Sequence, residues 1–249
     1  RIVGLDIEAA SRAPGVTRVF TAADLNPTCE PWMGTLDHFA RMTSIAQNIL
    51  ADGVVLWAGQ PVVMVVARSR AEAEDACELV FLDIEDDEPV VDGALALQAG
   101  AALAASELSG NLCYGTVLET AGVDRAFAEA AHVVEGEFVF GRHTAVTLEP
   151  RAIVADFDPA TGQLTVHQGT QTPYQFQDVY ARHFGLNEGQ VRVIAPDVGG
   201  SFGMKLHVYH EEMGVVAASK LLGRPVRFVA DRLESFLSDI HARDHKVKA

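Results

Sequence analysis

The residues of this sequence best suited to hold a ligand through their backbone lie in a glycine-rich stretch at 197–205. It reads Asp-Val-Gly-Gly-Ser-Phe-Gly-Met-Lys, with glycines at positions 199, 200 and 203. Glycine adopts positive φ angles and lets another group approach bare backbone, and free N–H groups in such a turn suit an anionic or oxygen-rich ligand. A tight connection without any ligand would use the same residues. The spacing matches neither the P-loop nor the dinucleotide-binding G-x-G-x-x-G.

A second group able to do chemistry is the side-chain amide of Gln171. It follows a predicted strand at 163–169 and precedes a predicted helix at 172–184. An amide at the end of a strand can donate a hydrogen bond into a crevice, where α/β sheets usually place ligands. A surface glutamine without a functional partner is the alternative interpretation.

Two histidines indicate a different kind of site. His207 and His210 are three residues apart, so on one helical face they could bind zinc together with Glu211. The pattern is neither H-E-x-x-H nor H-x-x-E-H, and the sequence offers no evident third ligand. The start of a helix with favourable acidic residues is the preferred interpretation. A zinc-dependent hydrolase using His207 and His210 is one alternative function.

Carboxylates at two places could also be functional. Glu149, in Leu148-Glu149-Pro150-Arg151, could act as an acid or base, but we favour a Glu–Arg pair that buttresses a loop. The acidic stretch 83–92 could bind a metal, yet its spacing matches no EF-hand loop. A solvated edge is the simpler interpretation of that stretch.

Hydrophobic periodicity and turn residues predict the elements that must position these groups. The glycine-rich stretch connects a predicted strand at 191–195 to a predicted helix at 208–222. A hairpin turn at 159–162 joins strands at 152–158 and 163–169. The remaining predictions are strands at 1–6, 16–21, 54–57, 61–67, 80–85, 132–140 and 226–229, a short helix or turn at 9–13, a helical turn at 22–25, helices at 70–79 and 123–131, an irregular segment at 28–52 and a linker at 93–118.

Composition excludes several classes of partner. The 249 residues are 49% hydrophobic, so the chain can bury a core. Its formal net charge of −15 argues against nucleic acid and anionic membranes as partners, because their phosphates need Lys and Arg. The three cysteines are far apart and form no C-x-x-C, which is typical of reduced thiols in a cytoplasmic protein. No uninterrupted apolar run of membrane length occurs.

The stretch from Val198 to Lys205 closely resembles the Gly-Gly-Gly-Phe-Gly-x-Lys signature of the molybdenum hydroxylases, the xanthine oxidase, aldehyde oxidase and carbon monoxide dehydrogenase group. Ser201 stands at the third glycine. The strand–helix–strand pattern around Gly59-Gln60-Pro61 is similar to the α/β hammerhead module of the same family. The resemblance implies an α+β fold, with a hammerhead-like domain and linker at 1–120 and the first part of a molybdenum-cofactor-binding domain at 121–249.

The resemblance also implies a site. It assigns cofactor binding to Gln171, Gly200, Ser201, Phe202 and Gly203. Gln171 and Phe202 would lie beside the molybdenum, the glutamine donating to an oxygen ligand of the metal and the phenylalanine placing its backbone against the cofactor. We therefore expect the N–H groups of Phe202 and Gly203 to point into an open crevice. No catalytic residue is expected within the chain, because the family's catalytic glutamate lies nearer the C-terminus of the full subunit.

The function implied is hydroxylation of an aldehyde, an N-heterocycle or a related small molecule, with water as the oxygen source. The cofactor would be molybdopterin, as such or as a dinucleotide. Partners would be a 2Fe-2S subunit, an FAD subunit and the remainder of the molybdopterin subunit, in a dimer of the assembled enzyme. Leu206 stands where xanthine-oxidising members have a substrate-binding glutamate, which weakens a purine assignment.

The two ends bear on completeness. Arg1 lies inside a predicted strand, and the chain stops at Ala249 straight after a charged stretch. We therefore expect both domains to be incomplete and the chain alone to be inactive. A non-catalytic fragment or split subunit that contributes only cofactor contacts is the second alternative function.

Overall fold

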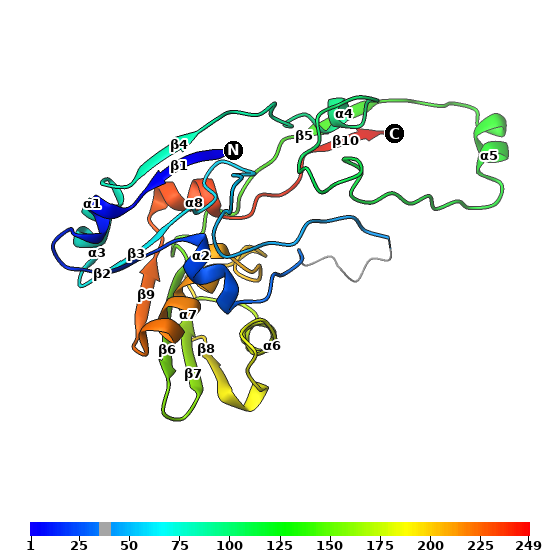
Figure 1. Cartoon of the computed structure of the whole chain (residues 1–249). Coiled ribbons are helices and arrows are strands. Elements are labelled where there is room, and N and C mark those ends of the chain that lie inside the picture. Colours follow the sequence, from blue (N-terminus) through cyan, green and yellow to red (C-terminus); the bar gives the residue numbers. More distant parts are fainter. Residues whose placement is uncertain (35–40) are drawn as a thin grey trace.

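The computed structural model describes residues 1–34 and 41–249 and shows an α+β fold, as expected (Figure 1). The N-terminal part contains two antiparallel pairs, β1 (Ile2–Asp6) with β4 (Phe81–Ile84) and β2 (Val16–Phe20) with β3 (Met64–Ala67). Three short helices, α1 (Glu8–Ser11), α2 (Ala22–Leu25) and η1 (Asn26–Thr28), and the longer α3 (Arg70–Cys77) join them. The Ser69 hydroxyl accepts the Glu72 N–H and caps α3.

The C-terminal part is built on a four-stranded sheet in the order β8-β7-β6-β9. The central strand β6 (Ala152–Asp158) is antiparallel to β7 (Gln163–Gln168) and to β9 (Val226–Val229), whereas β7 is parallel to β8 (Val191–Ile194), which η2 (Glu188–Gln190) precedes. Helix α6 (Pro173–His183) packs on β8, and α7 (His210–Leu222) packs on β6 and β9. Gly223, in the left-handed conformation, ends α7.

The irregular segment predicted at 28–52 ties the two parts together. Trp32 forms an isolated bridge with Gln47, and Trp32, Ile49 and Leu50 are buried in the same hydrophobic cluster as the sheet and α7. Gly214 of α7 lies so close to Ile49 and Met64 that a Cβ there would approach the Met64 sulfur at 3.3 Å. The segment 35–40 of this prediction lies outside the described residues.

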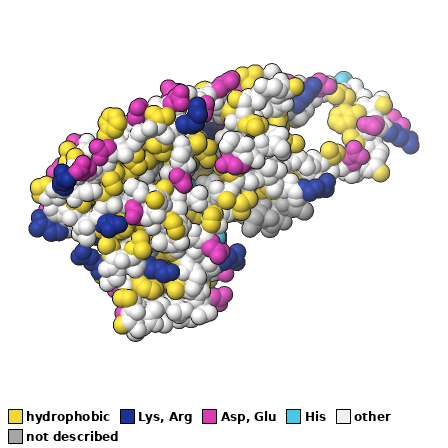
Figure 2. Space-filling view, in the orientation of Figure 1, with side chains coloured by type: hydrophobic (Ala, Val, Ile, Leu, Met, Phe, Trp, Pro, Cys, Tyr) yellow, Lys and Arg dark blue, Asp and Glu magenta, His cyan; other side chains and the backbone are white. Residues whose placement is uncertain are grey.

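The long chain segment that connects β4 to β6 extends away from the rest of the molecule and contains α4 (Gly93–Ala96), α5 (Val123–Glu129) and β5 (Glu137–Phe140) (Figure 1). Strand β5 pairs antiparallel with β10 (His245–Lys248), which follows α8 (Arg232–Ser238). Figure 2 shows apolar side chains exposed both on this connecting segment and on the rest of the molecule. Leu118 of the segment, for example, is 92% exposed. The acidic stretch 83–92 is largely exposed, as a solvated edge would be.

One predicted strand is wrong. Residues 54–57 are irregular, because Gly53 and Gly59 both adopt positive φ angles and the Leu56 N–H donates to the Gln60 side chain instead of a neighbouring strand. The predicted strand at 61–67 is limited to Met64–Ala67. No helix in the described ranges is long and apolar enough to cross a membrane.

Candidate functional site

The glycine-rich turn lies between the end of β8 and the start of α7, as predicted. Gly200 and Gly203 have φ angles of 97° and 84°, and Phe202 has a φ of 52°. A left-handed conformation costs a non-glycine residue about 1–2 kcal/mol. The Phe202 side chain is also 80% exposed, so burial does not offset this strain. A strained, exposed aromatic residue of this kind is typical of a functional site.

Gln171 meets this turn directly. Its side-chain Oε1 accepts a hydrogen bond from the Gly203 N–H at 3.1 Å and a second from the Ser201 hydroxyl. Its own backbone N–H donates to the Lys205 carbonyl at 3.3 Å, and the Thr170 hydroxyl donates to the same carbonyl at 2.8 Å. The fold therefore brings the residue after β7 together with the turn after β8, because the carboxyl ends of two neighbouring parallel strands lie side by side.

The expectation that the N–H groups of Phe202 and Gly203 point into an open crevice is wrong for Gly203, although neither group bonds within a helix or sheet. The Gly203 N–H is taken by Gln171, because the glutamine oxygen fits between it and Ser201. The Phe202 N–H makes no hydrogen bond within the described residues. The Gln171 Nε2 likewise has no partner in the part of the chain that the structure describes. A Cβ on Gly203 would meet nothing within 4 Å, so the space beside this residue of the turn is open.

Glu149 buttresses the turn, but its partner is not the predicted arginine. Its Oε2 accepts from the Lys205 ammonium at 2.6 Å and from the Gly199 N–H at 2.8 Å, while its backbone N–H donates to the Gly199 carbonyl. The bond from Lys205 is the main cause that lowers the pKa of the Glu149 carboxyl. A Cβ at position 199 would lie 2.5 Å from the Glu149 Cβ, so this close approach requires glycine.

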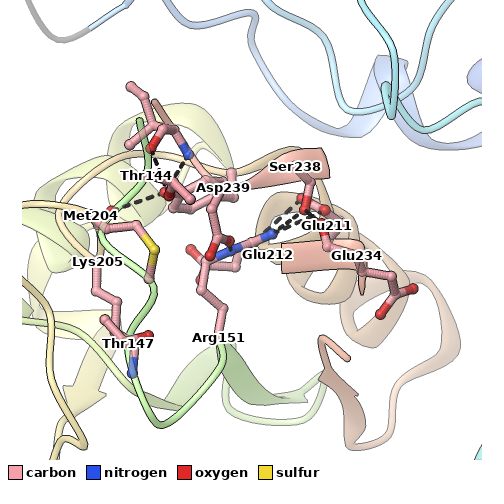
Figure 3. A network of polar contacts seen from close by, with 12 residues as sticks. Thr144, Thr147, Arg151, Met204, Lys205, Glu211, Glu212, Glu234, Ser238 and Asp239 are labelled. Carbon is pink, nitrogen blue, oxygen red and sulfur yellow. Dashed lines mark hydrogen bonds and ion pairs between the residues drawn. The ribbon is translucent and has the colours of Figure 1, made fainter. Parts of the chain in front are cut away.

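Arg151 does not contact Glu149 but lies in the interior, and its partners have no local signal in the sequence. It is fully buried, with Nε 2.6 Å from an Asp239 carboxylate oxygen and Nη2 2.7 Å from the Ser238 hydroxyl. It also pairs with Glu211 and lies over the Tyr209 ring. Figure 3 shows its side chain reaching toward Glu211 of α7 and toward Ser238 and Asp239 at the end of α8. This network fixes the elements that follow the turn.

A second buried chain of polar groups lies at the end of β7. The Tyr180 hydroxyl donates to Gln168 Oε1 at 2.8 Å, and Gln168 Nε2 donates to Glu212 Oε2 at 2.7 Å. Burial raises the pKa of the Glu212 carboxyl to about 8. The chain anchors the end of β7, three residues before Gln171, to helices α6 and α7.

The predicted histidine pair does not share a helical face. Helix α7 begins at His210, so His207 lies before it. The His210 Nδ1 lies 2.7 Å from the Asn48 carbonyl oxygen, its ring packs against Trp32 and Trp57, and burial lowers its pKa. Across residues 1–34 and 41–249 no group of three or more His, Cys, Asp or Glu residues could hold a metal ion. His210 is a core residue.

The free donors define what the site can accept. Gln171 offers two amide hydrogens and Phe202 offers a backbone N–H, and the neighbouring Gly203 has open space where a side chain would lie. These groups are uncharged donors beyond the carboxyl ends of β7 and β8, and they suit a ligand with oxygen or sulfur acceptors. Of the predicted site residues, Gly200, Ser201, Phe202 and Gly203 lie in one turn, and Gln171 contacts this turn at Ser201 and Gly203.

Comparisons with known proteins match both parts of the chain. Residues 1–88 match the family model "Aldehyde oxidase and xanthine dehydrogenase, a/b hammerhead domain", and residues 105–249 match "Molybdopterin cofactor-binding domain". The expected hammerhead fold followed by the start of a molybdenum-cofactor-binding domain is confirmed. The boundary near residue 120 stays a prediction.

Individual relatives agree. The chain is 39% identical over 249 residues to the nicotine 6-hydroxylase large subunit of Paenarthrobacter nicotinovorans, covering 99% of this chain and 30% of that protein. It is 35% identical over 258 residues to the carbon monoxide dehydrogenase large chain of Afipia carboxidovorans, covering 98% and 31%. The crystal structure of quinoline 2-oxidoreductase from Pseudomonas putida 86 superposes with a TM-score of 0.91 at 36% identity, covering 99% and 31%. The chain spans about a third of the length of these relatives.

Proposed function

This chain belongs to the molybdenum hydroxylase large-subunit family, and on that premise we propose that it forms part of the cofactor-binding subunit of a hydroxylase-type oxidoreductase. The substrate is an aldehyde, an N-heterocycle or a related small molecule, and water is the oxygen source. An N-heterocycle is the first candidate, because relatives are named for nicotine and for quinoline. Leu206, the residue after the motif lysine, argues against a purine substrate.

The observation that carries this proposal is the orientation of the Gln171 amide. Two donors from the turn hold its oxygen, so its nitrogen faces away from them without a partner among the described residues. Gln171 Nε2 and the Phe202 N–H would hold the molybdenum cofactor, with Gly200, Ser201 and Gly203 forming the turn against it. When bound, that cofactor supplies two-electron oxidation coupled to transfer of an oxygen from water.

The chain's own contribution is to position donors and keep them rigid. Gln171 is held at both its side chain and its backbone by the turn, so little freedom is lost when its amide donates to a ligand. A donor fixed in advance stabilises developing negative charge without reorganisation. No residue of this chain is proposed to move a proton from the substrate, and the chain alone is proposed to be inactive.

The partners and location are proposals as well. Relatives are named as a large subunit, a complex subunit gamma and a large chain, so assembly with other subunits is expected generally. We propose a 2Fe-2S subunit, an FAD subunit and the remainder of the molybdopterin subunit as partners, in a dimer of the assembled enzyme. A cytoplasmic location rests on the three free cysteines.

Substitution of Gln171 by alanine in the complete enzyme tests the proposal. Losing one donor to a buried acceptor costs roughly 1–3 kcal/mol, which corresponds to an about ten- to hundredfold loss of turnover. The control is Gln175→Ala, an exposed glutamine on α6 with no side-chain hydrogen bond within the described residues. Steady-state rates are normalised to bound molybdenum. A normalised rate of Gln171→Ala equal to that of the control would remove Gln171 from the site.

A further inference from the structure

Ser201 is the residue of the turn that departs from the motif Gly-Gly-Gly-Phe-Gly-x-Lys, and it is also the residue that contacts Gln171 through a side chain. We propose that Ser201 is a positioning residue, whose hydroxyl holds the Gln171 amide in the orientation that presents its nitrogen to the ligand. The proposal rests on the function proposed above for Gln171. It adds a role that a glycine at position 201 could not supply.

The direction of each hydrogen bond follows from the chemistry of the donors. A backbone N–H can only donate, so the Gly203 N–H at 3.1 Å requires the oxygen of the Gln171 amide, not its nitrogen, to face the turn. The Lys205 N–H donates to Ser201 Oγ at 3.2 Å. Since this donor occupies a lone pair of the hydroxyl, the single hydroxyl proton is directed toward Gln171 Oε1.

The result is a polar chain from the Lys205 N–H through the Ser201 hydroxyl to the Gln171 oxygen. Bonds in such a chain polarise one another and are strengthened together. The Lys205 carbonyl completes the contact by accepting the Gln171 backbone N–H. Both ends of Gln171 are therefore held by one short segment, 201–205.

Without the hydroxyl, a single contact would orient the amide. The Gly203 N–H alone would hold the oxygen, and the exposed Gln171 side chain could rotate to bond with solvent. The Lys205 N–H would also lose its acceptor. Ser201→Ala should therefore broaden the set of Gln171 conformers and lower the fraction of molecules with the nitrogen toward the ligand.

The test compares Ser201→Ala with Ser109→Ala in the complete enzyme; Ser109 is an exposed serine whose side chain makes no hydrogen bond in the described ranges. Turnover normalised to molybdenum should fall about fivefold in Ser201→Ala, as expected for loss of one hydrogen bond. Molybdenum content and KM should stay unchanged. A crystal structure of the variant enzyme should show Gln171 in more than one side-chain conformation.

A double variant shows whether Ser201 acts through Gln171. In enzyme that already carries Gln171→Ala, adding Ser201→Ala should not lower the rate further. An additive loss, or a single unchanged Gln171 conformation in Ser201→Ala, would overturn the proposal. The two proposals fail differently. An unchanged normalised rate in Gln171→Ala refutes the proposed role of Gln171 at the cofactor site. A reduced rate in Gln171→Ala with an unmoved amide in Ser201→Ala removes only the role of Ser201.

Discussion

Replacing Glu149 by glutamine should loosen the glycine-rich turn without changing the overall fold. The Lys205 side chain is 1% exposed, and its ammonium lies 2.6 Å from the Glu149 carboxylate. Glutamine keeps an oxygen that can accept from the ammonium and from the Gly199 N–H, but it carries no charge. The variant therefore leaves a buried cation without a counterion while preserving the shape of the contact.

The magnitude follows from this geometry. A hydrogen bond to a charged group contributes about 1.5–3 kcal/mol against about 1 kcal/mol for a neutral one, and removing one member of a fully buried ion pair costs about 3–5 kcal/mol. The Glu149 side chain is 39% exposed, so solvent screens part of the interaction. We expect a local destabilisation of roughly 2 kcal/mol, which should speed amide exchange in the turn about thirtyfold.

Hydrogen exchange measured by mass spectrometry on peptides covering 197–205 of the complete enzyme provides the assay. The matched control is Lys205→Met, which keeps the buried stem and leaves Glu149 able to reach water, so exchange should rise only about fivefold, for roughly 1 kcal/mol. The double variant should resemble the control, because no cation is then left unpaired. Equal effects of the two single variants, or additive effects in the double variant, would refute the buttress.

The same pair predicts a pH dependence. The pKa of Glu149 is lowered in the folded state, chiefly by the bond from Lys205, from an ordinary value of 4.5. A carboxyl with a lowered pKa contributes stability above its unfolded value, and this contribution is lost as the pH falls through the folded value. Protection of the turn, corrected for intrinsic exchange, should therefore weaken below about pH 4.5 in the unmodified enzyme and not in Glu149→Gln.

Two further predictions concern buried charges, and both are measured as free energies of unfolding of the complete subunit in urea. Arg151→Leu leaves Asp239 buried without its 2.6 Å partner and should lower the free energy of unfolding by about 3–5 kcal/mol. The control Arg192→Leu, at an exposed position, should change it by no more than about 0.5 kcal/mol. Equal losses in the two variants would contradict the buried network. Burial raises the Glu212 pKa to about 8 from 4.5, so between these pH values the folded state binds more protons than the unfolded state, and the free energy of unfolding falls as the pH rises. Glu212→Gln should remove this pH dependence. An unchanged pH dependence would show that another group causes it.

The elements nearest the site could be predicted because their signals are local. The alternating run at 152–158 matches β6 residue for residue, and the hairpin turn at 159–162 follows from its proline and glycine. The turn at 197–205 was recognisable because three glycines lie within five residues between a strand and a helix. Such features depend on side chains only a few residues apart.

The features that were missed or misjudged depend on residues far apart in the sequence. The partner of Glu149 is 56 residues away rather than two, and Arg151 meets Asp239 across 88 residues. Strand β10 exists because β5 offers it an edge, which its charged sequence does not reveal. The apolar run at 54–57 predicts a strand, but glycines on both sides with positive φ angles make it a loop. The preferred interpretation of His210, the start of a helix, is confirmed, but its enclosure by two tryptophans from distant segments has no local signal.

The central claim is that the Gln171 amide and the Phe202 N–H face a bound molybdenum cofactor. A crystal structure of the complete, molybdenum-loaded enzyme, with anomalous scattering to locate the metal, tests it most directly. The structure should show Gln171 Nε2 within hydrogen-bonding distance of an acceptor atom of the cofactor, while Oε1 keeps its bonds to Ser201 and Gly203. A metal site elsewhere in the subunit, or a Gln171 nitrogen that contacts only solvent, would contradict the claim.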